Sequence, residues 1–88
     1  AKSERWELRA VVASALANFG VDENTDALID LLCDREWWVR FRAAESLTQS
    51  KHIKAVQNHV KKREDRYAQE MLQFALDKQA LRNRKGVA

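Results

Sequence analysis

A short pattern of residue types recurs in this chain at a fixed distance of 31 residues. Each member of the first set has a counterpart of the same type in the second: Trp6 and Trp37, Arg9 and Arg40, Ala13 and Ala44, Leu16 and Leu47. Inside each set the residues lie three or four positions apart, which is helical spacing. A repeat of this kind is typical of helix pairs that stack in a row, because one such pair cannot bury its apolar face alone.

The chain lacks the residues that interrupt helices. Its 88 residues include no proline and two glycines, at positions 20 and 86. We therefore expect an all-α fold of about five antiparallel helices, over residues 3–18, 25–33, 36–49, 51–62 and 65–81. Ser3 is the expected cap of the first helix, and Gly20 lies just past its end. A compact bundle would also suit these helices, but the 31-residue repeat favours a short right-handed α-solenoid.

The first expected helix has two distinct faces. One is apolar and the other is made of small side chains, so that a neighbouring helix can approach it closely. The apolar set is Leu8, Val12, Ala15, Leu16 and Phe19, and the small set includes Ala10, Ala13 and Ala17. We expect residues 1–81 to form a single domain and residues 82–88 to form a polar, disordered tail.

Charge is distributed unevenly along the chain. Residues 1–50 hold six Lys/Arg against nine Asp/Glu, a net charge of −3, whereas residues 51–88 hold ten against four, a net charge of +6. A basic C-terminal half can attract nucleic acid, anionic lipid or an acidic protein surface.

The segment from Asp34 to Leu47 carries a recognisable motif, D-x-x-W-x-V-R-x-x-A-A-x-x-L. It resembles the HEAT repeat in the short form found in phycobilisome-lyase-like and many bacterial HEAT-repeat proteins, and the resemblance suggests a C-terminal fragment of such a protein. In that family an Asp in the turn and an Arg six residues later tie the repeats together. The resemblance therefore implies a bond from Arg40 to the turn at Asp34, and a partner for Arg9 in an earlier repeat. Met71 stands where an Arg would follow Asp65, as in a terminal capping repeat.

The resemblance also implies that the second helix of each pair lines a binding surface. The leading hypothesis is a protein-interaction scaffold whose partner contacts that surface, and the alternative is a polyanion-binding module that uses the basic helix over residues 51–66. The candidate binding residues are Asp26, Asp30, Lys51, Lys54, Lys61 and Trp38. A surface that is acidic on one helix and basic on the next favours a protein partner, because proteins are mixed in charge, over nucleic acid.

Trp37 and Trp38 are adjacent, so on a helix their side chains point roughly 100° apart. We expect that one packs between repeats while the other covers the turn. Alternatively, the more exposed ring anchors a partner, since interface energy concentrates in Trp, Tyr and Arg.

No pattern in the chain favours catalysis, a metal or a cofactor. His52 and His59 with the distant Cys33 do not make a zinc-binding spacing, and two glycines are too few for a phosphate-binding loop. Ser14, Ser46 and Cys33 have no histidine base at a suggestive position. No apolar run approaches the roughly 20 residues that cross a bilayer. The single cysteine fits a reducing compartment, so we expect a cytoplasmic location. We also expect a monomer that needs no cofactor.

Overall fold

The computed structural model describes the backbone of residues 5–87 and the side chains of residues 5–83. This part of the chain folds into five α-helices and one short 3₁₀ helix, and it contains no strand, as expected from the sequence. The elements are α1 (Trp6–Asn18), η1 (Asp22–Asn24), α2 (Thr25–Leu32), α3 (Trp37–Leu47), α4 (Ile53–Lys62) and α5 (Arg66–Val87). The expected cap, Ser3, lies outside the described residues.

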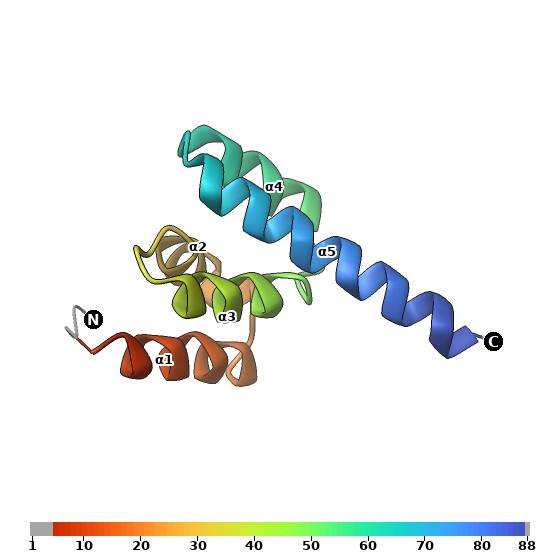
Figure 1. The fold of residues 1–88 in the computed structure, drawn as a ribbon, viewed down its shortest axis with the longest axis horizontal. Helices are drawn as coiled ribbons and strands as arrows, with labels where there is room; N and C mark the ends of the chain where they lie inside the picture. Colours follow the sequence, from red (N-terminus) through yellow and green to blue (C-terminus); the bar gives the residue numbers. More distant parts are fainter. Residues whose placement is uncertain (1–4, 88) are drawn as a thin grey trace.

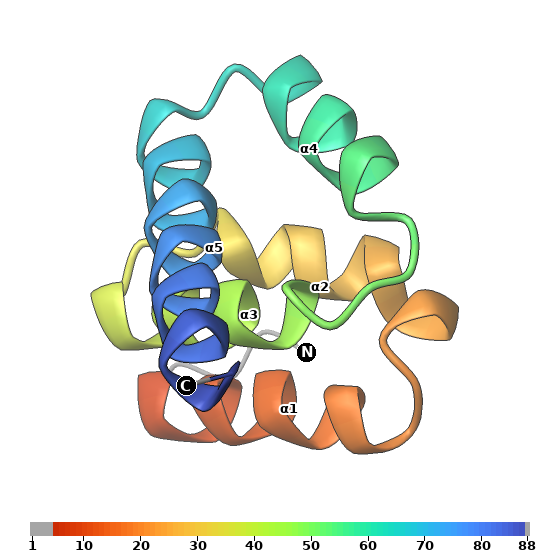
Figure 2. The same cartoon turned by 90° about the vertical axis from the view of Figure 1, so that its right-hand side faces the viewer.

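The helices form two rows. Helices α1 and α3 lie side by side and run in the same direction, and α2, which connects them along the chain, runs back in the second row (Figures 1 and 2). Helix α5 follows α3 in the first row but crosses it at an angle, while α4 lies beside α5 and α2. The stacking of α1 on α3 confirms the arrangement expected from the 31-residue repeat.

The core lies between the two rows and is supplied mainly by α2 and α3. Leu28, Ile29 and Leu32 of α2 are fully buried, as are Val39 and Leu47 of α3. Fully burying a side chain of this size stabilises the fold by about 1.5–3 kcal/mol. Helices α4 and α5 complete this cluster with the small or branched side chains Val56, Val60, Ala68, Leu72 and Ala75.

Helix α1 packs on α3 through its small residues. Ala13 is fully buried, and its carbonyl oxygen accepts a hydrogen bond of 3.1 Å from the Ser46 hydroxyl of α3. The close approach allowed by small side chains is thus confirmed. Of the larger apolar residues, Leu16 packs against the core, whereas Leu8 of α1 and Phe19 just past its end remain 49% and 81% exposed.

The turns between helices are held by specific contacts. Gly20 has a φ of +116°, a left-handed conformation that favours glycine, and it ends α1 as predicted. The carboxylate of Asp22, in the following 3₁₀ turn, accepts a bond of 2.6 Å from the Ser50 hydroxyl beyond α3. This bond joins the turn after α1 to the turn after α3.

Helix α5 is longer than the pattern of apolar residues suggests. Its last core-facing residue is Leu76, yet the helix continues past residue 81 to Val87, through most of the segment 82–88 expected to be disordered. The arginines and the lysine of this segment have good helix propensity and no proline stops the helix, so that it continues despite the less favourable Asn83 and Gly86. The domain limits of 1–81 stay a prediction.

Candidate protein-interaction surfaces

The corner between α2 and α3 is organised by Asp34. Its carboxylate accepts two bonds from Arg9 of α1, Nε to Oδ2 at 2.7 Å and Nη2 to Oδ1 at 3.1 Å, and one from the Glu36 amide at 2.9 Å. Arg40 donates from Nη1 to the Asp34 carbonyl oxygen at 2.8 Å. The predicted bond from Arg40 to this turn is confirmed. Arg9 also reaches forward to Asp34, a contact that the sequence did not indicate, and its expected partner in an earlier repeat stays a prediction.

These bonds set the protonation of Asp34. Burial opposes the ionised carboxylate, but the bonds from Arg9 and from the Glu36 amide outweigh it, so the pKa of Asp34 is lowered. The carboxylate is therefore charged at neutral pH, and the corner behaves as a structural ion pair.

The acidic and basic candidate residues lie on the second row of helices. Asp26 and Asp30 are exposed on α2, and Lys54 and Lys61 are exposed on α4. Lys51 is exposed in the turn before α4, where its amide lies 3.4 Å from the Asp22 carboxylate. All five therefore belong to the second row of helices or to the turn that precedes α4.

The direct link between the acidic and basic helices is made by a residue outside the candidate set. Arg63, which follows α4, places Nη2 at 2.5 Å from Oδ1 of Asp30. Lys61 instead lines a groove on the other flank of α4, against α5. The sequence places Arg63 in the basic run after residue 51. Its contact with α2 could not be predicted, because it depends on how α2 and α4 cross.

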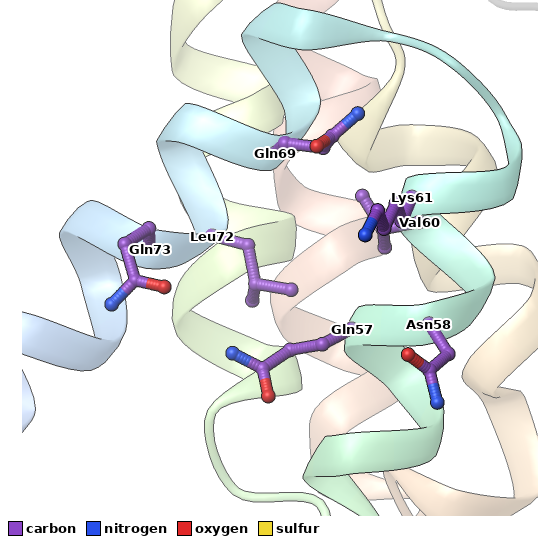
Figure 3. Close-up of a pocket in the computed structure, with 7 residues that line it drawn as sticks. All are labelled: Gln57, Asn58, Val60, Lys61, Gln69, Leu72 and Gln73. Atoms are coloured by element: carbon purple, nitrogen blue, oxygen red, sulfur yellow. The ribbon is translucent and has the colours of Figure 1, made fainter.

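That groove lies between α4 and α5 and has a volume of about 190 Å³ (Figure 3). Four amide side chains and two apolar residues line it with Lys61: Gln57, Asn58, Gln69, Gln73, Val60 and Leu72. In Figure 3, Gln57 of α4 and Leu72 of α5 point toward one another across it. Val60 and Leu72 are almost fully buried, so the accessible lining comes mainly from the amide side chains and Lys61.

The two adjacent tryptophans belong to an aromatic cluster on α3. Trp37 stacks on Phe41 with ring centroids 5.1 Å apart, and Trp38 meets the edges of both rings at 4.9 and 5.9 Å. Both tryptophans are about half exposed, at 46% and 49%. The expectation that one packs between repeats is wrong, because both rings stay about half exposed and small residues such as Ala13 fill the contact between α1 and α3.

The position of Trp38 separates it from the other candidates. It lies on α3, in the row of first helices, whereas Asp26 and Lys54 lie in the second row. Around the cluster, Lys78 of α5 places Nζ 5.2 Å from the centre of the Phe41 ring and 3.8 Å from the Glu45 carboxylate. The six candidate residues therefore form two surfaces.

Chemistry of other kinds has little support among the described residues. Burial raises the pKa of the Cys33 thiol, so it is protonated at neutral pH. His52 and His59 are both exposed, and residues 5–83 contain no group of three or more His, Cys, Asp or Glu side chains placed to hold a metal. Within the described chain no helix has the length and apolar character needed to span a membrane.

Stacked helix pairs tied by an Arg–Asp corner define a helical-repeat protein of the α-solenoid class. A family model for HEAT repeats matches residues 1–77, and the chain therefore belongs to the HEAT-repeat family. Comparisons with curated proteins and with solved structures gave no match. HEAT repeats generally mediate protein–protein interaction.

Proposed function

We propose that this chain is a protein-interaction scaffold whose partner contacts the exposed side of α2 and α4. Membership of the HEAT-repeat family supports a binding role. The observation that carries the choice of surface is the meeting of opposite charges, in which Asp30 on α2 is joined to Arg63 after α4. Exposed charges of both signs on neighbouring helices suit a partner that also carries both signs.

The contact residues proposed on this surface are Asp26, Asp30, Lys51, Lys54 and Lys61. All five are exposed, so a partner can reach them without unfolding. Trp38 is proposed as a separate anchor on the first row of helices. Its half-exposed ring is held by Trp37 and Phe41, so little side-chain entropy is lost when a partner covers it.

A uniform polyanion fits this surface less well. Two arginines of the basic segment 51–66 are already engaged, Arg63 with Asp30 and Arg66 with Glu70. The carboxylates of α2 would also repel a chain of phosphates. Nucleic acid or anionic lipid is therefore the second candidate, carried by the exposed lysines of α4 alone.

A charge-reversal experiment tests the proposed surface. The immobilised chain captures partners from an extract of the cells that make it, and each captured protein is quantified for wild type and for the variant Lys54→Glu/Lys61→Glu. The matched control, Arg42→Glu/Arg82→Glu, changes the net charge equally on α3 and α5, where both residues are exposed. We expect a partner that the first variant loses and the control keeps. Equal retention by both variants would sink the proposed surface.

A salt titration separates the second candidate from the first. Binding of wild type to duplex DNA and to phosphatidylserine vesicles is measured between 50 and 200 mM salt, an interval over which three or four phosphate contacts would lower affinity by about 40- to 150-fold. A binding constant that falls this steeply, with no captured protein, would make the chain a polyanion-binding module.

A further inference from the structure

The guanidinium of Arg40 has one edge without a partner. Its Nη1 donates to the carbonyl oxygen of Asp34 at 2.8 Å, but Nε and Nη2, on the opposite edge, make no hydrogen bond to a described residue. Nε is buried, and it is the one buried side-chain nitrogen or oxygen atom of the described residues that lacks a partner. Because an unpaired buried donor destabilises a fold, this edge points to an acceptor that the chain does not supply.

Arg9 shows which chemical group fits such an edge. It occupies the same place as Arg40 in the 31-residue repeat, and its Nε and Nη2 hold the Asp34 carboxylate at 2.7 and 3.1 Å. The two oxygens of a carboxylate match the fork formed by these nitrogens. A further step of 31 residues leads from Asp34 to Asp65, whose carboxylate instead accepts the Ala68 amide at the start of α5 at 3.0 Å. Arg40 therefore lacks the carboxylate that Arg9 has.

Arg40 lines an open pocket where the loop between α2 and α3 meets the start of α5. The pocket has a volume of about 380 Å³. Arg35 and Tyr67, both exposed, belong to its lining, and neither side chain makes a hydrogen bond or an ion pair with a described residue. The lining residues are Cys33, Asp34, Arg35, Arg40, Asp65 and Tyr67. Two guanidinium groups and one phenolic hydroxyl thus offer unused donors to the same space.

The charges around the pocket favour an anion with a single charge. Asp34 is already neutralised by Arg9, and Asp65 lies at the N-terminus of α5, where the helix dipole stabilises a negative charge. Arg35 and Arg40 have no carboxylate partner among the described residues, so one added negative charge is stabilised. A phosphate group carries about two charges at neutral pH and would be repelled more strongly by the two aspartates.

We propose that this pocket binds an acidic side chain, an aspartate or a glutamate, of the protein partner. Its carboxylate lies on the Nε/Nη2 edge of Arg40, with Arg35 and the Tyr67 hydroxyl as further donors. The Tyr67 ring is 71% exposed, so the stem of the entering side chain and the partner surface around it can cover the ring. This inference rests on the proposed scaffold function and names the residue type that the partner inserts.

Acetate tests the pocket, because it carries the carboxylate of an acidic side chain on one methyl group. Sodium acetate is titrated into the ¹⁵N-labelled chain at constant ionic strength, and the arginine Nε–H signals are followed by NMR. The signal that disappears in Arg40→Lys is assigned to Arg40. We expect that signal to shift to a plateau, while the signal of Arg42, exposed on the same helix, stays in place. Absence of a plateau, or tighter binding of inorganic phosphate than of acetate, would overturn the inference.

Matched variants locate the bound carboxylate. Arg35→Ala and Tyr67→Phe each remove a donor but none of the bonds that hold the corner, and each should weaken acetate binding by about three- to tenfold. Arg42→Ala makes the same change of charge as Arg35→Ala, outside the pocket, and should leave the affinity unchanged. Equal effects of these two variants would mean that acetate only responds to net charge, which would also overturn the inference.

The competing occupant within the chain is Asp65. Asp65→Asn removes its charge but keeps a side chain that can cap α5. Because a nearby negative charge is lost, acetate should bind this variant somewhat more tightly than it binds wild type. If acetate binds the variant and not wild type, Asp65 itself occupies the edge of Arg40 in solution, and the pocket is not a site for a partner.

Capture of the partner distinguishes this inference from the function on which it rests. If Arg35→Ala/Tyr67→Ala captures the protein partner as well as wild type does, this inference fails and the scaffold proposal stands. If Lys54→Glu/Lys61→Glu and its control both retain every partner, the proposed second-helix surface fails whatever the pocket binds.

Discussion

Arg9 and Asp34 form a forked ion pair that ties the first helix pair to the corner of the next. Its two bonds measure 2.7 and 3.1 Å, and 9% and 13% of the two side-chain surfaces are exposed. Partial burial and two-point geometry distinguish this pair from ordinary surface ion pairs, which contribute little. This ion pair joins α1 to the loop that precedes α3.

The pH dependence of stability should report this pair. Because the folded-state pKa of Asp34 is lowered, its contribution is fully present above the unfolded pKa of about 3.9 and is lost as pH falls through the folded value. The variant Asp34→Asn lacks that contribution at every pH. We therefore expect the wild-type and variant free energies of unfolding to differ at pH 7 and to converge toward pH 2–3 in urea titrations. A constant gap across this range would contradict the assignment.

Arg40 should stabilise the same corner by a different bond. Arg40→Ala removes the 2.8 Å bond to the Asp34 carbonyl oxygen, at a cost of about 1–2 kcal/mol in the free energy of unfolding. The control is Arg42→Ala, which breaks an exposed 3.9 Å contact with Glu45 and should cost at most about 0.5 kcal/mol. Chemical denaturation of both variants makes the comparison, and an equal effect would remove the special role of Arg40.

The aromatic cluster should show measurable coupling. In a double-mutant cycle, Trp37→Ala and Phe41→Ala should be non-additive by about 0.5–1.5 kcal/mol, since the two rings stack 5.1 Å apart and 9° from parallel. The control cycle pairs Phe41→Ala with Trp6→Ala on α1 and should be additive. Additivity in both cycles would mean that the stack is not populated in solution.

The orientation of α1 predicts a contrast between two apolar residues. Phe19 is 81% exposed, so Phe19→Ala should change the free energy of unfolding by no more than about 0.5 kcal/mol. Leu28 is fully buried, so Leu28→Ala should cost about 2–5 kcal/mol. Thermal and urea denaturation measure both effects. A large loss from Phe19→Ala would mean that α1 packs through its other face.

The sequence was most informative where one residue type decides the local structure. The absence of proline, the glycine at position 20 and the recurring Trp-Arg-Ala-Leu pattern were enough to predict five helices and the stacking of α1 on α3. The end of α5 was harder to predict, because residues 82–87 are polar apart from Val87 and show no apolar periodicity that would mark a helix.

Contacts between distant segments were the least predictable. Spacing paired Arg40 with the turn at Asp34, six residues earlier. The bond from Arg9 to the same aspartate spans 25 residues and depends on how α1 stacks on α3. The exposure of Trp37 and Trp38 was hard to predict for the same reason, because it depends on which face of α3 packs against α1. Arg63 reaches Asp30 for a similar reason, since the crossing of α4 and α2 is set by tertiary packing.

Three polar contacts follow one another along the contact between α1 and α3: Arg9 to Asp34 near its start, Ser46 to Ala13 in its middle, and Asp22 to Ser50 beyond its end. An interface of alanine methyl groups is smooth, and by itself it offers little resistance to one helix sliding past the other. These three contacts act as fixed points against that shear. A load applied along the helix axes must strain all of them together, whereas a load applied across the stack opens them one at a time. The molecule should therefore be mechanically stiff in one direction and yielding in the other.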